Sequence, residues 1–257
     1  MCRHLAYLGP PASLQEVLID PPHGLYRQSW APRRQRFGTV NADGFGVGWY
    51  AGDDPVPARY RRDLPIWADD SFAGIARVTR TGALLAAVRS ASEATAHDAA
   101  AAAPFAADGW LFSHNGRLDG WPASWAGLAA TLPSVELLEL EARVDSALLW
   151  ALVLHRLRAG LEAAAAVHGT LAAIEQAGLT GRFNMLLTDG RSITASASGD
   201  TLCYRAVCYR EGAGAVVVAS EPADDDPGWQ DVPDGAVLNV SIDDVLNVSI
   251  DERIEIR

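Results

Sequence analysis

The sequence predicts an α+β domain in which helices and sheets form separate layers. Strand patterns occupy the first part of the chain, two helical stretches lie in the middle, and short β-rich runs separated by turns fill the last third. The length of 257 residues and the hydrophobic fraction of 49% suit one large domain with a full core. We expect this domain to span residues 1–241, with a tail over 242–257 that forms an extra strand or a mobile appendage.

The N-terminal part begins with an apolar run over residues 5–8 that predicts a strand. Ser13 and Glu16 form a capping-box pattern that opens a short helix, which Pro21-Pro22 would end. The following loop contains four arginines and predicts a solvated charged segment or, as the alternative, an anion-attracting rim of a substrate entrance (Arg27, Arg33, Arg34, Arg36).

Residues 41–50 place a glycine at every second position (Gly44, Gly46, Gly48). On a strand these glycines would leave one face without side chains, so that another backbone or a ligand can approach closely. Tight sheet packing and a ligand wall remain equal alternatives. Residues 51–70 are rich in Pro, Asp and Arg and predict a surface excursion.

Residues 83–88 predict a buried strand that ends at Arg89. A guanidinium there needs a carboxylate, which belongs either to the protein or to a substrate. Residues 110–118 predict a strand that runs into an Asn115-Gly116 turn. This pair indicates a hairpin or, next to a catalytic cysteine, an oxyanion site made by the side-chain amide and the backbone N–H.

The middle of the chain predicts one helix from Val135 to Leu157 and another from Leu161 to about Ala177. Asp145 interrupts the first helix pattern, where its carboxylate is either capped or solvated or is directed at a ligand ammonium. The last third predicts a sheet of neighbouring hairpins, with strands over 183–188, 192–198, 201–209, 214–219 and 236–242. The tail repeats one seven-residue sequence at 237–243 and 245–251.

Composition restricts the partners. A formal net charge of −11 disfavours nucleic acid and anionic membranes, so a small-molecule substrate is expected. No apolar run approaches the roughly 20 residues that span a bilayer, and no secretory pattern is visible, which predicts a cytoplasmic protein. The histidines show no paired spacing, and Cys203 and Cys208 would face opposite sides of a strand. We therefore expect neither a metal site nor a cofactor.

Cys2 is the residue around which the chemistry is organised. Removal of Met1 before a small residue would leave Cys2 with a thiol and a free α-amine. Their ordinary pKa values of about 8.5 and about 7.7 allow a proton to pass between them, so that the cysteine carries its own base.

Six segments together resemble, in order, the class II glutamine amidotransferases, which are N-terminal-nucleophile hydrolases. They are Met1-Cys2, Asn41 to Gly48, Val88 to Ser92, Ser113 to Gly116, Val144 to Ser146 and Ala219 to Pro222. The single-domain architecture, Ala103-Pro104-Phe105 and the region from Ala219 to Trp229 are most similar to the γ-glutamyl hydrolases of ergothioneine biosynthesis. That group removes glutamate from γ-glutamyl-hercynylcysteine sulfoxide.

The resemblance implies a four-layer αββα sandwich and a role for each matching residue. Cys2 would be the nucleophile with its α-amine as base, and Asn115 with Gly116 would form the oxyanion hole. Arg89, helped by Ser92, would bind the α-carboxylate of the γ-glutamyl group, and Asp145 its α-ammonium. Gly46 would lie beside the substrate.

The sequence departs from the family where many members have Arg-Trp-Ala-Thr-His-Gly and this chain has Arg89 to Ala94. This difference weakens glutaminase coupling to a synthase more than it weakens hydrolysis, and His97 has no assigned role. Two alternatives stay open: a glutaminase that supplies ammonia to a separate synthase chain, and a catalytically silent γ-glutamyl-binding module. The repeated tail could add a strand at a sheet edge and favour a homodimer.

Overall fold

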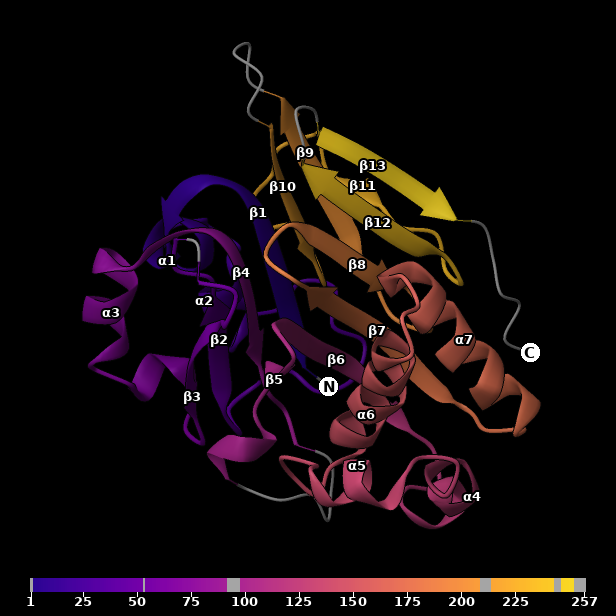
Figure 1. Ribbon diagram of the computed structural model, residues 1–257. Helices are drawn as coiled ribbons and strands as arrows, with labels where there is room; N and C mark the ends of the chain where they lie inside the picture. Colours follow the sequence, from indigo (N-terminus) through magenta and orange to yellow (C-terminus); the bar gives the residue numbers. More distant parts are fainter. Residues whose placement is uncertain (1, 53, 92–97, 209–213, 243–245, 252–257) are drawn as a thin grey trace.

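The computed structural model describes residues 2–52, 54–91, 98–208, 214–242 and 246–251. Two antiparallel sheets pack face to face, and helices cover the outer face of each sheet (Figure 1). This arrangement confirms the predicted αββα sandwich. His97 and Ser92 lie outside the described residues.

The first sheet has seven strands in the order β11-β9-β10-β1-β4-β2-β3. The central strand is β1, which pairs with β10 on one side and with β4 on the other, where Arg3 lies opposite Val88. Cys2 directly precedes this central strand. The strands are β1 (Arg3–Ser13), β2 (Phe45–Trp49), β3 (Ala58–Arg62), β4 (Arg80–Val88), β9 (Cys203–Cys208), β10 (Gly214–Ala219) and β11 (Gln230–Asp231).

The second sheet has six strands in the order β13-β12-β8-β7-β6-β5. The repeated seven-residue segments form its two outermost strands on one side, and Val240 of β12 lies opposite Val248 of β13. The strands are β5 (Phe105–Ala107), β6 (Trp110–Leu118), β7 (Gly181–Thr188), β8 (Ser192–Ser196), β12 (Val237–Ile242) and β13 (Leu246–Asp251).

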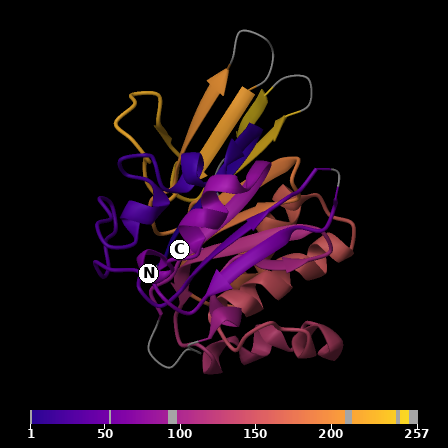
Figure 2. The same cartoon turned by 90° about the vertical axis from the view of Figure 1, so that its left-hand side faces the viewer.

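The helices divide between the two outer faces. Three short ones lie on the first sheet: α1 (Leu14–Leu18), α2 (Leu25–Gln28) and α3 (Phe72–Val78). Both hydrogen bonds of the predicted capping box are present at α1. The long helices α6 (Asp145–Arg158) and α7 (Ala163–Gln176) cover the second sheet and lie behind the sheets in Figure 2. Two further short helices, α4 (Ala126–Ala129) and α5 (Ser134–Leu138), and three 3₁₀ turns (Ile66–Ala68, Ala99–Ala101, Ala123–Trp125) complete the described elements.

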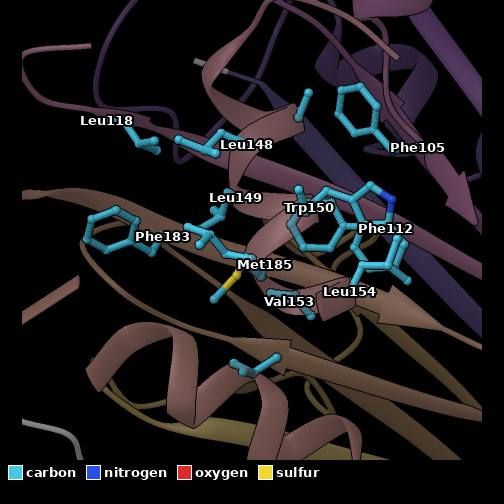
Figure 3. Close-up of a cluster of buried hydrophobic side chains, with 14 of the residues drawn as sticks. Phe105, Phe112, Leu118, Leu148, Leu149, Trp150, Val153, Leu154, Phe183 and Met185 are labelled. Atoms are coloured by element: carbon cyan, nitrogen blue, oxygen red, sulfur yellow. The ribbon is translucent and has the colours of Figure 1, made fainter. Parts of the chain in front are cut away.

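Three apolar clusters hold the layers together. One lies between the sheets, where Leu85 and Val216 of the first sheet meet Leu186 of the second. Another packs α6 and α7 on the second sheet, and Figure 3 shows its aromatic centre, where the rings of Phe112 and Trp150 stack at 5.0 Å. The third packs α1 and α3 on the first sheet. Burial of apolar surface on both faces therefore fixes each sheet in the sandwich.

Several element predictions were wrong. A continuous helix over 135–157 does not form, because α5 ends at Leu138 and α6 begins only at Asp145. The apolar spacing in α5 is misleading, since Val135 and Leu138 are 59% and 87% exposed. The described part of 51–70 lies at the surface, as predicted, but it also contains the edge strand β3.

Two further predictions about strands were also wrong. Asn115-Gly116 makes no turn, because β6 continues through both residues, which pair with Asn184 and Phe183 of β7. The strands of the last third do not share one sheet: β9 and β10 join the first sheet, whereas β7, β8 and β12 belong to the second.

Candidate active site

A cavity of about 500 Å³, including its open mouth, brings together residues from five segments of the chain, one of which contains Ala101, Ala103 and Phe105. Cys2 comes from the start of the chain, Arg89 from the end of β4, Gly116 from β6 and Asp145 from the start of α6. These four residues were predicted from the sequence as parts of one site, and all of them line the same cavity.

Cys2 is half-buried, and its two reactive atoms are held from different sides. Its backbone nitrogen donates a hydrogen bond to Asn115 Oδ1 at 3.1 Å. Its Sγ lies 4.0 Å from the carbonyl oxygen of Ser90. This nitrogen is the peptide nitrogen that follows Met1, and it becomes the α-amine in a chain that begins at Cys2. The nitrogen that the resemblance assigns as the base therefore contacts an oxygen that accepts its hydrogen bond.

The pairing of β6 with β7 determines where the backbone N–H of Gly116 points. In an antiparallel ladder, a pair of residues exchanges either both backbone hydrogen bonds or none. Phe183, opposite Gly116, donates its N–H away from β6 to Ser198 O at 2.9 Å, so the Gly116–Phe183 pair exchanges none. The Gly116 N–H therefore points to the other edge of β6, where Leu118 N donates to Asp145 Oδ2 at 3.3 Å.

That edge is open to the cavity, because β5 pairs with β6 only between residues 110 and 112. The Gly116 N–H thus faces the cavity, the direction in which an oxyanion would accept it. Glycine is also required for packing, since a Cβ at residue 116 would overlap Arg182 O and His114 Nε2.

Arg89 is buried at the end of β4, with 8% of its surface exposed. Its backbone exchanges hydrogen bonds with Asp43 N and Gly44 O, and its Nη1 donates to Asp43 O at 3.3 Å. The carboxylate of Asp43 in turn accepts from Ala91 N at 2.8 Å. These contacts fix the turn after β4, so the guanidinium is held at the cavity rather than in solvent.

Asp145 is the first residue of α6 and is 9% exposed. Its Oδ1 accepts from Ser146 N at 2.8 Å, and its Oδ2 accepts from Leu118 N at 3.3 Å. A carboxylate is favoured in the first turn of a helix because the N-terminal N–H groups carry partial positive charge. The cavity therefore has a buried cation and a buried anion in its lining, Arg89 and Asp145.

Sequence reasoning missed His114, which also lines the cavity. Its Nδ1 lies 2.9 Å from Ser146 Oγ and its Nε2 lies 2.8 Å from Arg182 O. Because a carbonyl only accepts, the Nε2 carries the proton and Nδ1 accepts from the serine. Burial lowers the pKa of His114, although the negative charge of Asp145 opposes the shift. The two-residue period of the strand, which puts His114 on the same face as Gly116, was the available signal.

Other predicted positions lie elsewhere. Gly46 does not line the cavity, since its Cα faces the carbonyl of Ala103, which a Cβ would overlap. Gly48 packs against Leu111 in the other sheet. Both contacts are those expected of tight packing, and a substrate contact at Gly46 stays a prediction.

Arg27 lies in α2 rather than in the predicted loop, and none of the four arginines predicted there lines the cavity. Arg33 and Arg34 form ion pairs with Asp225 and Asp231. Within the described residues, no group of three or more His, Cys, Asp or Glu side chains is placed to hold a metal ion.

Comparison with known proteins gives a consistent picture. Residues 24–211 match the family of class-II glutamine amidotransferases. The chain is 43% identical over 240 residues to a γ-glutamyl-hercynylcysteine sulfoxide hydrolase of Mycolicibacterium smegmatis, a match that covers 93% of this chain and 96% of the relative. A protein of the same name from Mycobacterium tuberculosis is 39% identical, with 94% and 93% of the two chains covered.

Solved structures share the fold. A glutamine aminotransferase class-II domain protein from Silicibacter pomeroyi superposes with a TM-score of 0.69 and 21% identity, over 98% of this chain and 100% of that chain. The glutamine phosphoribosylpyrophosphate amidotransferase of B. subtilis superposes with a TM-score of 0.64 and 16% identity, over 96% of this chain but 49% of the larger enzyme.

Proposed function

This chain belongs to the class-II glutamine amidotransferase family, and from that premise we propose the following chemistry for its cavity. The chain is an amidohydrolase that cleaves a γ-glutamyl C–N bond. It converts γ-glutamyl-hercynylcysteine sulfoxide into glutamate and hercynylcysteine sulfoxide, the reaction for which its relatives are named. The observation that carries the mechanism is the contact between Cys2 N and Asn115 Oδ1 at the cavity that Arg89 and Asp145 also line.

Binding of the γ-glutamyl group follows from the charges of the lining. An α-amino acid end carries one carboxylate and one ammonium, and the cavity offers one guanidinium and one carboxylate. Arg89 pairs with the substrate carboxylate, and Asp145 accepts from the substrate ammonium. Ser92 supports the carboxylate, and Gly46 lies beside the substrate. The γ-carbonyl is then directed toward the Cys2 sulfur.

The reaction has two steps. The α-amine takes the thiol proton, and the Cys2 sulfur attacks the γ-carbonyl carbon while Asn115 Nδ2 and the Gly116 N–H stabilise the oxyanion. The C–N bond breaks, and the protonated α-amine of Cys2 gives its proton to the leaving amine. The glutamyl group then remains on Cys2 as a thioester. Water, deprotonated by the same amine, then attacks the thioester carbonyl, and the C–S bond breaks to release glutamate and restore the thiol.

The test uses the chain from which Met1 has been removed, as checked by intact mass. Glutamate release is measured with γ-glutamyl-hercynylcysteine sulfoxide and with L-glutamine, supplied separately, and a Cys2→Ala variant serves as the blank. Turnover of the sulfoxide with little turnover of glutamine is expected. Turnover of glutamine alone would instead indicate an ammonia donor with a separate synthase chain. Turnover of neither substrate by a chain with a free Cys2 would favour a binding module.

The molecular setting is part of the same proposal. A small molecule is the substrate, and the reducing cytoplasm would keep the Cys2 thiol active. No helix among the described residues is both long and apolar enough to cross a membrane.

We treat residues 1–241 as the catalytic domain, to which β13 adds an edge strand through its pairing with β12. Sedimentation of a chain truncated after Ser241 tests whether the added segment supports a homodimer.

A further inference from the structure

We propose that Asp200 is a positioning residue that fixes the orientation of the Asn115 amide and, through it, the nitrogen of Cys2. The proposal rests on the proposed function, because it assigns a role in the reaction of that site. Asp200 lies between β8 and β9, 85 positions from Asn115 in the sequence, and no sequence motif connects the two residues.

The contacts form a continuous chain behind the nucleophile. The side chain of Asp200 is fully buried, and its Oδ2 accepts from Asn115 Nδ2 and from Arg3 Nη2, each at 3.3 Å. Its Oδ1 accepts from Thr201 N at 2.8 Å. At the other end of the amide, Asn115 Oδ1 accepts from Cys2 N at 3.1 Å. One carboxylate therefore connects the loop after β8 to the residues that flank the thiol.

The chemistry of the two groups determines which way the amide faces. A carboxylate only accepts hydrogen bonds, so the NH₂ end of Asn115 must turn toward Asp200 and its oxygen toward Cys2. The amine then donates to that oxygen and keeps its lone pair for the thiol proton. An amide at position 200 has donors of its own and would permit the opposite orientation. In that orientation Asn115 Nδ2 would point at the lone pair of the base.

Arg3 is the buried ion-pair partner of the Asp200 carboxylate. Arg3 is fully buried, its Nε donates to Gln35 Oε1 at 3.2 Å, and its guanidinium compensates Asp200. A neutral residue at position 200 would leave this positive charge unbalanced beside Cys2. A more positive surrounding favours the deprotonated form of each neighbouring group, so the amine and thiol of Cys2 would both lose protons at lower pH.

Other charged or titratable groups face the same region and are unchanged in an Asp200 variant. Glu221 lies near Arg3, His4 follows in β1, and three more groups line the cavity (Arg89, His114, Asp145). A shift seen on changing Asp200 alone is therefore assigned to the carboxylate itself.

The experiment compares Asp200→Asn with Asp224→Asn in the chain that begins at Cys2. Asp224 is the matched control, since it also pairs with an arginine, Arg205, but has no contact with Asn115. Two quantities are measured: steady-state kinetics with γ-glutamyl-hercynylcysteine sulfoxide, and the rate of Cys2 alkylation by iodoacetamide between pH 5 and 9, followed by peptide mass spectrometry. The alkylation needs no substrate, so it remains interpretable even if the proposed substrate is wrong.

For Asp200→Asn we expect kcat to fall by about tenfold to a hundredfold with KM within about twofold, because the amide is misoriented but the binding groups are intact. The alkylation curve should move to lower pH by about one unit. Asp224→Asn should leave both unchanged. An Asp200→Asn enzyme with the kcat and pH curve of the original would overturn the proposal, and so would a lower kcat with an unmoved pH curve, because that is the result of a merely structural role.

A second variant keeps the test decisive if Asp200→Asn does not fold. Asp200→Glu retains the charge but displaces the carboxylate, so it should keep the original pH curve while kcat falls. A pH curve that moves in Asp200→Glu would contradict the assigned cause. Absence of turnover in the original chain, by contrast, would count against the proposed substrate and leave the comparison of alkylation curves intact.

Discussion

The amide of Asn115 links two proposed roles beside the Cys2 thiol. Its oxygen contacts the nitrogen that we propose as the base. One N–H of its NH₂ group donates to Asp200, and the other is proposed to stabilise the oxyanion. An Asn115→Ala variant should lose about 3 kcal/mol of transition-state stabilisation, which lowers kcat roughly a hundredfold with little change in KM. Steady-state kinetics measures the effect. Asn239→Ala, which removes an amide bonded to Thr194 in the second sheet, is the control. Full activity of Asn115→Ala would refute the oxyanion assignment.

Arg89 should affect binding more than chemistry. A lysine at this position keeps the charge but presents a point charge in place of a planar fork, so Arg89→Lys should raise KM by about tenfold or more and change kcat less. Initial rates over a wide substrate range separate the two constants. A variant in which only kcat falls would place Arg89 in the chemical step instead.

At the scale of elements, Gly116 allows β6 and β7 to pair closely beside the site. Gly116→Ala should destabilise the fold by about 1–3 kcal/mol, because the new Cβ would overlap the Arg182 carbonyl, which belongs to the backbone and cannot rotate away. Gly74→Ala in α3 is the matched control: no atom lies within 4 Å of its added Cβ, and alanine should stabilise the helix by about 0.5–1 kcal/mol. Urea denaturation of both variants tests the contrast. Equal stability of the two would contradict the close pairing.

The sequence predicted the local elements better than their connections. The capping box of α1 and the strand up to Arg89 follow from neighbouring residues, and both are present. The break between α5 and α6 could not be seen, because Val135 and Leu138 have helical spacing but face solvent. The contact of Asp200 with Asn115 depends on the packing of two sheets, which no local pattern encodes.

At the scale of the whole molecule, stability should depend on pH through histidines in the interior. Burial lowers the pKa of His114 and lowers that of His4 well below its usual value, helped for His4 by the positive charge of Arg3. The unfolded chain takes up protons near pH 6.5 whereas the folded chain does not, so the free energy of unfolding must fall as pH drops below about 6.5. Each histidine contributes at most about 1.4 kcal/mol per pH unit.

Urea denaturation between pH 7.5 and pH 5.5 measures this slope, in a range where ordinary carboxylates change little. A His4→Gln variant should show a shallower slope, since one of the two contributing groups is absent. An identical slope in the variant would mean that His4 does not stay neutral in the folded protein.

The αββα architecture was predicted in full, although only through resemblance, because strand patterns do not show how strands divide between two sheets. Of the predicted site, Cys2, Arg89, Gly116 and Asp145 line one cavity, and Asn115 contacts Cys2. His114 was missed because the histidines show no paired metal-ligand spacing, and only the strand period, which puts His114 on the same face as Gly116, indicates it. The site depends on residues from both sheets and from α6, so its completeness is a property of the whole sandwich.

The position of Cys2 directly before the central strand determines at which end of this domain another polypeptide can be fused. A purification tag or fused domain placed ahead of Cys2 would convert its amine into an amide and direct a polypeptide at the cavity that Cys2 lines. Fusion behind β13 avoids both effects, because that strand lies at the outer edge of the second sheet. Any working bifunctional protein built on this domain, by recombination or by design, should therefore carry it at the N-terminus. Its initiator methionine must directly precede the cysteine and be removed.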